Sequence, residues 1–347
     1  MIDIPSYVII SILSGYLCYL FVPIICKYCV EHDLYDMPGP RKIHKKPIPR
    51  LGGVAFFAAY FLGLLPGFLL LPDLFWSNIK SLIGIFAGGL IIFALGLVDD
   101  IRGLKPLTKL SWQVVACLVL VAFGVRLEYI NIPFYKLIDS GVWGIPLTVI
   151  WLVAIINTIN IIDGLDGLAA GVSAIIAISF LVLSQIMGLA LPSLLAAGII
   201  GITLAFLKYN YFPASIFMGD SGALLLGYLF GVISLFWPKS FATVVMFVPI
   251  LALGVPIIEV FTTFTRRMYA GKKFYIADKR HIFHYLLDLG IPERVAVWLF
   301  YLVSIQFALA TFGIVGGNRN ILIVLQTVFI ILTAIIVSRN LKLENRR

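Results

Sequence analysis

Apolar runs of membrane length recur along the whole chain and are separated by short polar segments. A helix needs about 20 predominantly apolar residues to cross the hydrocarbon core of a bilayer. The composition agrees, because 61% of the 347 residues are hydrophobic and only 12% are charged. Soluble domains carry about 25% charged residues. We therefore predict an all-α, polytopic integral membrane protein whose apolar surface is covered by lipid.

The spacing of the apolar runs predicts about eleven transmembrane helices. They are expected near residues 5–26, 51–72, 81–98, 110–124, 142–159, 168–187, 192–208, 221–237, 242–265, 294–315 and 321–338. The first run lacks a small-residue cleavage site, so we interpret it as a retained membrane helix and not as a signal peptide. An odd number of helices places the two termini on opposite sides of the membrane.

The distribution of basic residues predicts the orientation. With the N-terminus outside, 21 of the 26 Lys and Arg residues fall on the inner side and 5 on the outer side. Cytoplasmic loops carry an excess of Lys and Arg, so we expect a cytoplasmic C-terminus and a net charge of +9 concentrated on the cytoplasmic face. Such a face suits an anionic lipid head group or a phosphorylated small molecule. We expect no nucleic-acid partner, because the chain has no soluble basic domain.

Residues 157–167, with the sequence NTINIIDGLDG, interrupt two apolar runs with four polar side chains. They are Asn157, Asn160, Asp163 and Asp166. Ionisable groups at membrane depth are costly and indicate a function. A helix cap would need only one such residue. The segment therefore predicts a polar site that approaches a highly charged ligand.

A second polar cluster lies at the end of the third run, where Asp99 and Asp100 are adjacent. Neighbouring residues on a helix point about 100° apart, so we expect different roles for the two side chains. Adjacent carboxylates raise each other's proton affinity, which suits a general base. Lys109 and Gln113 follow on one helix face, and Lys109 can hold a phosphate as a point charge.

Asp220 opens another apolar run within FMGDSG, where the flanking glycines allow a close backbone approach. It can serve as a helix cap or as a magnesium ligand. The acidic clusters all fall on the inner side, which favours magnesium. Mg²⁺ prefers a few carboxylate oxygens completed by water and phosphate.

Five basic residues of the inner loops are candidates for contacts to phosphate or nucleotide. They are Arg50, Arg266, Arg280, His281 and His284. An Arg side chain supplies a forked donor that matches phosphate oxygens. The two histidines would share one face of a helix, and no Cys/His set accompanies them that would favour zinc.

These motifs resemble those of the polyprenyl-phosphate N-acetylhexosamine-1-phosphate transferases, glycosyltransferase family 4. The resemblance covers nearly the whole chain, in family order. The matching segments are residues 36–53, LVDD with Lys109 and Gln113, NTINIIDGLDGL, FMGDSG, and DKRHIFH after Arg266 and Arg267.

The resemblance implies transfer of an amino sugar phosphate from a UDP-sugar to undecaprenyl phosphate, with release of UMP. It also implies Mg²⁺ as cofactor, with Mn²⁺ as a substitute, and it is compatible with a homodimer. The matching positions imply catalytic roles for Asp99, Asp100 and Asp163, metal binding by Asp220, and substrate binding by Arg50, Lys109, Asn157, Asn160, Asp166, Arg266, Arg280, His281 and His284.

The segment 278–284 distinguishes subfamilies by resemblance. The branch that uses N-acetylglucosamine shows Asp-x-x-His-x-His-His, and this chain differs only at Phe283. We therefore expect UDP-GlcNAc as donor, with another UDP-N-acetylhexosamine or UDP-MurNAc-pentapeptide as alternatives. We expect one transferase domain over 1–347 in a bacterial cytoplasmic membrane, with active-site loops near 27–50, 99–109, 157–167, 208–220 and 266–293.

Two alternatives lie outside this family. A CDP-alcohol phosphatidyltransferase also uses DG repeats, but its motif needs an Ala-Arg pair that DGLDGLAAGVSA lacks. A transporter of an anionic solute needs polar groups near the membrane midplane. The one-sided acidic clusters disfavour a transporter.

Overall fold

The computed structural model describes residues 4–39, 46–132, 136–236, 282–316 and 327. The helix predicted at 242–265 lies outside these ranges, and so does all but one residue of the helix predicted at 321–338. The other nine predicted helices lie wholly or almost wholly within the described ranges.

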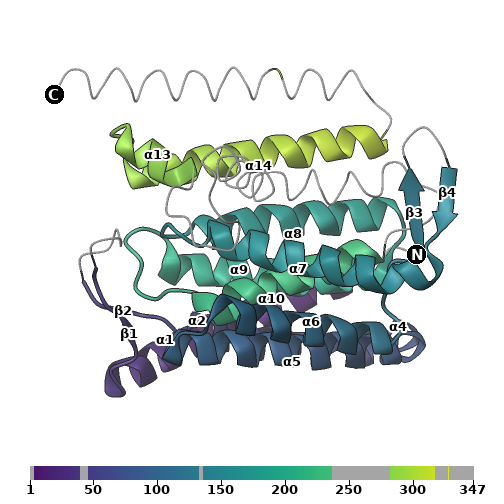
Figure 1. Ribbon diagram of the computed structural model, residues 1–347, viewed down its shortest axis with the longest axis horizontal. Coiled ribbons are helices and arrows are strands. Elements are labelled where there is room, and N and C mark those ends of the chain that lie inside the picture. Colours follow the sequence, from purple (N-terminus) through teal and green to yellow (C-terminus); the bar gives the residue numbers. More distant parts are fainter. Residues whose placement is uncertain (1–3, 40–45, 133–135, 237–281, 317–326, 328–347) are drawn as a thin grey trace.

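The described chain is built mainly from helices. They are α1 (Ile4–Glu31), α2 (Gly52–Leu64), α3 (Gly67–Leu70), α4 (Pro72–Ser77), α5 (Ile79–Arg102), α6 (Pro106–Ala122), α7 (Gly144–Ile162), α8 (Leu168–Ile186), α9 (Ala190–Asn210), α10 (Gly219–Leu235), α13 (Ile282–Asp288) and α14 (Glu293–Gly316). A single 3₁₀ turn, η1 (Gly141–Trp143), precedes α7. The long helices run side by side along the long axis of the molecule (Figure 1).

Seven helical segments in the described ranges are long and apolar enough to cross a membrane. They are 5–31, 52–70, 79–102, 141–162, 168–186, 190–210 and 293–312. The apolar helices α6 and α10 are shorter, with 17 residues each. The chain is therefore a multi-pass membrane protein. The predicted count of eleven is not reached within the described ranges, because two of the expected helices fall largely outside them.

Two short antiparallel strand pairs depart from the purely helical prediction. β1 (Tyr35–Asp36) pairs with β2 (Ile48–Pro49), and β3 (Tyr129–Ile132) pairs with β4 (Lys136–Asp139). The two pairs lie at opposite ends of the molecule (Figure 1). In the described part of the chain the apolar runs form long helices, and both strand pairs lie in the connections between them.

Helix α10 is the centre of the packing. It contacts α2, α5, α7, α8 and α9, and its residues 219–234 are buried except for Asp220. A helix that is apolar on all sides is expected in such a buried position. Close packing depends on glycine, because a Cβ at Gly96 of α5 would lie 2.5 Å from the Ser221 nitrogen.

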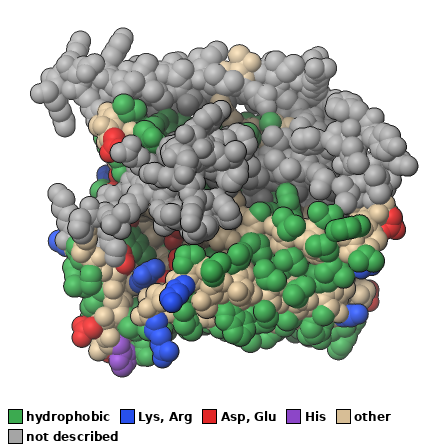
Figure 2. All heavy atoms as spheres, in the orientation of Figure 1, with side chains coloured by type: hydrophobic (Ala, Val, Ile, Leu, Met, Phe, Trp, Pro, Cys, Tyr) green, Lys and Arg blue, Asp and Glu red, His purple; other side chains and the backbone are tan. Residues whose placement is uncertain are grey.

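The outer surface of the bundle is apolar. Large hydrophobic side chains such as Ile12, Leu69 and Ile150 are 66%, 87% and 65% exposed. Hydrophobic side chains cover much of the described surface in Figure 2. A surface of this kind is stable in contact with lipid and would be a liability in water.

Candidate active site

The start of α2 is tied to the start of α10 through backbone hydrogen bonds. The Phe217 amide donates to the Pro49 carbonyl at 2.8 Å, and the Gly52 amide donates to the Phe217 carbonyl at 3.0 Å. Glycine is needed here, since a Cβ at Gly52 would lie 2.6 Å from that same Phe217 oxygen. This pairing places Arg50 beside the end of α5, where its Nε lies 3.1 Å from Asp100 Oδ1.

The Asp100 side chain caps the N-terminus of α10. Its fully buried carboxylate accepts hydrogen bonds from the Asp220 amide at 2.8 Å, the Ser221 amide at 3.0 Å and the Ser221 hydroxyl at 2.7 Å. A carboxylate is favourable there because it meets unpaired amides and the positive end of the helix dipole. Arg50 bridges onward to Asp36, with its Nη1 3.7 Å from Asp36 Oδ1.

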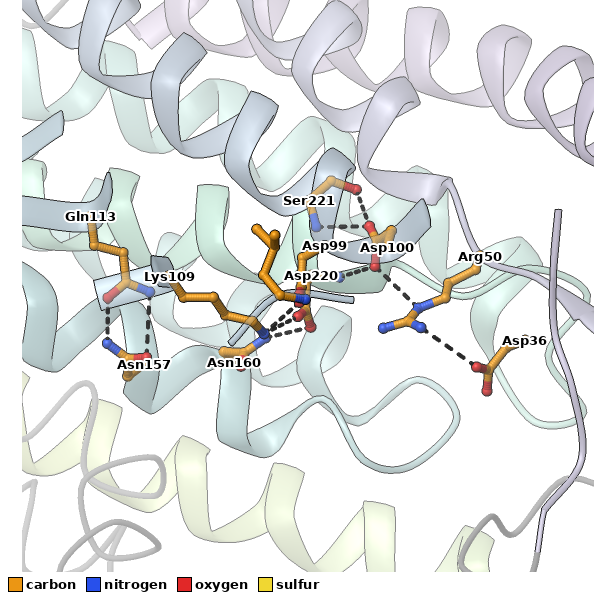
Figure 3. A network of polar contacts seen from close by, with 11 residues as sticks. Asp36, Arg50, Asp99, Asp100, Lys109, Gln113, Asn157, Asn160, Asp220 and Ser221 are labelled. Atoms are coloured by element: carbon orange, nitrogen blue, oxygen red, sulfur yellow. Dashed lines mark hydrogen bonds and ion pairs between the residues drawn. The ribbon is translucent and has the colours of Figure 1, made fainter. Parts of the chain in front are cut away.

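Asp99 points to different partners from Asp100. Its Oδ1 accepts a hydrogen bond from the Leu104 amide at 2.6 Å, and its Oδ2 forms an ion pair with Lys109 Nζ. The same ammonium lies 2.5 Å from Asp220 Oδ2, and Asn160 Nδ2 donates to Asp220 Oδ1 at 2.9 Å. Asp99, Lys109 and Asp220 thus form a lysine–carboxylate trio at the centre of the site (Figure 3).

Asn157 lies one helical turn before Asn160 on α7 and is hydrogen-bonded to Gln113 of α6. Asn157 Nδ2 donates to Gln113 Oε1 at 2.8 Å, and Gln113 Nε2 donates back to Asn157 Oδ1 at 3.4 Å. Lys109 and Gln113 are four residues apart on α6, so both project toward α7 (Figure 3). Gln113 of α6 and Asn157 of α7 therefore satisfy each other's hydrogen-bonding groups where the two helices meet.

Asp163 ends α7 and is only partly exposed. Within the described ranges its carboxylate accepts no hydrogen bond, in contrast to Asp99 and Asp100. Burial, together with the negative charges of Asp220 and Asp100, raises the pKa of Asp163 to about 7. A carboxyl group with this pKa can take up and release a proton near neutral pH.

Asp166 and Gly167 are braced by residues far away in the chain. Asp166 Oδ2 accepts from the Ala214 amide at 2.8 Å, and the Asp166 amide donates to Glu293 Oε1 at 3.2 Å. The Gly167 amide donates to Asn210 Oδ1 at 3.1 Å. Gly167 has a φ of 77°, a conformation that suits glycine.

Several contributors were not among the predicted site residues. Asp36, Ser221 and Glu293 each contact a predicted one, and Asn210 accepts a hydrogen bond from Gly167, the neighbour of Asp166. Only Asn210 and Ser221 carry a local signal, because both lie beside polar breaks in apolar runs. Glu293 looks in sequence like an ordinary acidic residue in the first turn of a helix.

Some predicted site residues fall outside this description. Arg266, Arg280 and His281 lie outside the described residues, and of His284 only the backbone, in α13, is described. The structure brings together Arg50, Asp99, Asp100, Lys109, Asn157, Asn160 and Asp220. Asp163 is close enough to interact electrostatically with Asp220, Asp100 and Arg50.

Carboxylates, amides and a lysine gather at one end of a multi-pass helical bundle, an arrangement that suits a charged ligand. The sequence profile of glycosyl transferase family 4 matches residues 82–238. The "probable undecaprenyl-phosphate N-acetylglucosaminyl 1-phosphate transferase" of Bacillus subtilis (strain 168) is 34% identical over 96% of this chain and 90% of its own length. The chain belongs to glycosyl transferase family 4.

Two further relatives differ in the substrates that their names state. The decaprenyl-phosphate N-acetylglucosaminephosphotransferase of Mycolicibacterium smegmatis is 34% identical over 76% of this chain and 71% of its own. The phospho-N-acetylmuramoyl-pentapeptide-transferase of Clostridioides difficile is 29% identical over 83% of this chain and 90% of its own. Similarity is therefore higher to the relatives named for N-acetylglucosamine.

Family membership implies a metal-dependent transferase. The described residues contain no group of three or more His, Cys, Asp or Glu side chains suited to hold a metal ion. The trio nevertheless fits a hard cation, because two carboxylate oxygens converge on one ammonium that stands in for it. One or two carboxylates suffice for Mg²⁺ when substrate phosphates and water complete its shell.

Proposed function

We propose that this chain transfers N-acetylglucosamine 1-phosphate from UDP-GlcNAc to undecaprenyl phosphate in a Mg²⁺-dependent reaction. The products are a lipid-linked pyrophosphoryl amino sugar and UMP, in the first membrane step of cell-envelope polysaccharide synthesis. The observation that carries the proposal is the lysine–carboxylate trio beside Asp163 at one end of an apolar bundle. The 34% identity to the Bacillus subtilis relative supports this choice of reaction.

The reaction forms a bond between an oxygen of the lipid phosphate and the phosphorus that carries the sugar. The bond from that phosphorus to UMP breaks. Catalysis of such transfers rests mainly on alignment and charge neutralisation. Lys109 and Arg50 supply positive charge, and a bound Mg²⁺ would add Lewis-acid stabilisation of phosphate oxygens, held by Asp220 and Asp99.

Asp163 is the carboxylate best suited to accept the proton of the lipid phosphate. Asp100 is occupied by the first turn of α10, and Asp99 by Leu104 and Lys109. Asp163 accepts no hydrogen bond within the described ranges, and its pKa is about 7. A phosphate monoester has a second pKa near 6, so this transfer is nearly balanced at neutral pH.

The remaining predicted residues are proposed to bind the donor. Asn157, Asn160 and Asp166 would face the nucleotide and its phosphates, as would four residues predicted in the 266–284 segment, Arg266, Arg280, His281 and His284. The alternative donors are another UDP-N-acetylhexosamine and UDP-MurNAc-pentapeptide, and Mn²⁺ is proposed to substitute for Mg²⁺. The lower identity to the muramoyl-pentapeptide relative favours UDP-GlcNAc.

We further propose that the whole chain is one transferase domain in a bacterial cytoplasmic membrane, active as a monomer or homodimer. The N-terminus would lie outside and the site would face the cytoplasm, as the basic residues indicate. Impermeant maleimide tests this on Lys105→Cys and Arg126→Cys variants. Intact cells should label position 126 and spare position 105, and the reverse pattern would refute the orientation.

The decisive assay incubates the purified protein with radiolabelled UDP-GlcNAc, undecaprenyl phosphate and Mg²⁺. Lipid-linked label and UMP should appear together and should be absent with EDTA. Asp220→Ala should lose turnover while retaining folded protein. If no product forms with Mg²⁺ present, the transferase proposal is wrong. Uptake of an anionic solute into vesicles by the same protein would favour the transporter instead.

A further inference from the structure

Lys109 binds the two carboxylate oxygens that a metal in this site would need. Asp99 Oδ1 already accepts from the Leu104 amide and Asp220 Oδ1 from Asn160. The Oδ2 atoms of both residues remain, and both meet the Lys109 ammonium. A cation that binds both carboxylates through these Oδ2 atoms would therefore occupy the position that Lys109 Nζ holds.

The lysine and the metal are mutually exclusive at this position on electrostatic grounds. Mg²⁺ binds carboxylate oxygens at about 2.0–2.1 Å. An ammonium that kept its contact with the same oxygens would lie within about 4 Å of the ion. Repulsion between a divalent and a monovalent cation at that distance is strong even at an effective dielectric constant of about 20.

The charges of the site favour an exchange. Within the described ranges, the four carboxylates of Asp99, Asp100, Asp163 and Asp220 have two positively charged neighbours, Lys109 and Arg50. Without a metal, the pair Asp99 and Asp220 needs Lys109 as its counter-ion. Once a divalent cation neutralises the pair, that positive charge becomes available for the phosphates of a substrate.

We propose that Lys109 is a built-in counter-ion of the Asp99–Asp220 pair that the metal displaces on binding. The released ammonium then turns to the donor's pyrophosphate, so metal binding prepares the phosphate site. This inference rests on the proposed function for the metal and for the phosphorylated substrate. It assigns to Lys109 two successive positions, of which the structure shows the first.

Acylation of the wild-type protein tests the exchange without any mutation. Detergent-solubilised protein is treated briefly with N-hydroxysuccinimide acetate, with or without Mg²⁺, and acetylation is measured by peptide mass spectrometry. Lys105 is the internal control, because it is exposed at the beginning of the same helix. Mg²⁺ should raise the Lys109 rate at least about fivefold, since the ammonium leaves its two carboxylates, and should change the Lys105 rate less than about twofold. An unchanged or slower Lys109 rate would overturn the exchange.

Metal affinity provides a second measurement. Mn²⁺ binding, followed by electron paramagnetic resonance, is compared in the wild type and in matched Lys109→Met and Lys105→Met variants. Lys109→Met should bind Mn²⁺ about tenfold or more tightly than the wild type, because no ammonium competes. Lys105→Met should match the wild type. Equal or weaker binding by a folded Lys109→Met protein would contradict the proposal, and if that variant does not fold, the acylation result decides.

The same preparation separates this inference from the proposed function. UMP release is measured in parallel with acylation. If Mg²⁺ raises the acetylation rate of Lys109 but the protein releases no UMP, the transferase proposal alone is overturned. If the protein makes lipid-linked product but Mg²⁺ does not change the acetylation rate of Lys109, the exchange alone is overturned.

Discussion

At the scale of single residues, the three predicted catalytic carboxylates are held in different ways. Asp100 accepts three hydrogen bonds from the first turn of α10, and Asp99 is bound by an amide and an ammonium. Asp163 has no such partner within the described ranges, and burial raises its pKa to about 7. The oxygens of Asp99 and Asp100 are thus engaged by donors, whereas those of Asp163 are open to a proton from a substrate.

The first prediction concerns Asp163→Asn. Loss of a general base should lower kcat by about 10²–10⁴-fold, with KM for UDP-GlcNAc changed far less. In the wild type, kcat/KM should rise with pH through about 7, because this ratio reports the free enzyme and the base works only when deprotonated. UMP release between pH 5.5 and 9 measures both. A variant that keeps more than a tenth of wild-type kcat would remove Asp163 from this role.

Stability provides a control with a defined sign. A carboxyl group whose pKa is raised by folding destabilises the fold as pH rises from its unfolded value of about 3.9 toward its folded value of about 7. Asp163→Asn should therefore raise the thermal midpoint more at pH 8 than at pH 5. An equal change at the two pH values would mean that Asp163 keeps an ordinary pKa.

At the scale of elements, the site depends on how closely α10 approaches its neighbours. A Cβ at Gly53 of α2 would collide with the Gly222 backbone of α10, and one at Gly96 of α5 would collide with Ser221. Small residues allow this approach in membrane helices, where packing and not the hydrophobic effect holds helices together. The approach of α5 delivers Asp100 to the amides of α10.

The second prediction is that Gly53→Ala destabilises the protein by about 1–3 kcal/mol, through overpacking between α2 and α10. Activity should fall as well, since the same contact positions Arg50 beside Asp100. Gly39→Ala is the matched control, because nothing lies within 4 Å of a Cβ at Gly39. Thermal midpoints and UMP release compare the two. Equal effects of the two substitutions would refute the packing argument.

At the scale of the whole molecule, the loop after α7 is shaped by helices distant in the sequence. Asn210 at the end of α9 accepts from the Gly167 amide, and Tyr301 of α14 donates to the Gly167 carbonyl at 2.6 Å. Glu293, 127 residues beyond Asp166, accepts from the Asp166 amide. Helix α14 therefore takes part in holding the loop that presents Asp163.

The third prediction separates this positioning role of Glu293 from its charge. Glu293→Gln keeps an acceptor oxygen and should retain kcat within about threefold, whereas Glu293→Ala leaves the Asp166 amide unpaired and should lower kcat about tenfold. The wild-type pH profile should persist in both variants, because Asp163 itself is unchanged. If Gln is as harmful as Ala, the charge of Glu293 matters and the hydrogen-bond argument fails.

The sequence by itself determined the multi-pass membrane class and the family. Hydropathy over about 20 residues is a local property, and carboxylates at the ends of apolar runs are too costly to be incidental. The polar clusters at 99–100, 157–166 and 220 were therefore visible in advance. The helix count could not be settled in this way, since α6 and α10 are only 17 residues long.

Only the tertiary structure decided which partner each polar group takes. Lys109 meets Asp220 across 111 residues, and Asp100 caps α10 across 120. Such pairings follow from the angles and distances at which helices pack, which glycines and neighbouring side chains set together. Nothing in the local pattern distinguishes Asp99 from Asp100. Their different surroundings arise because Asp99 meets Lys109 of α6, whereas Asp100 meets the first amides of α10.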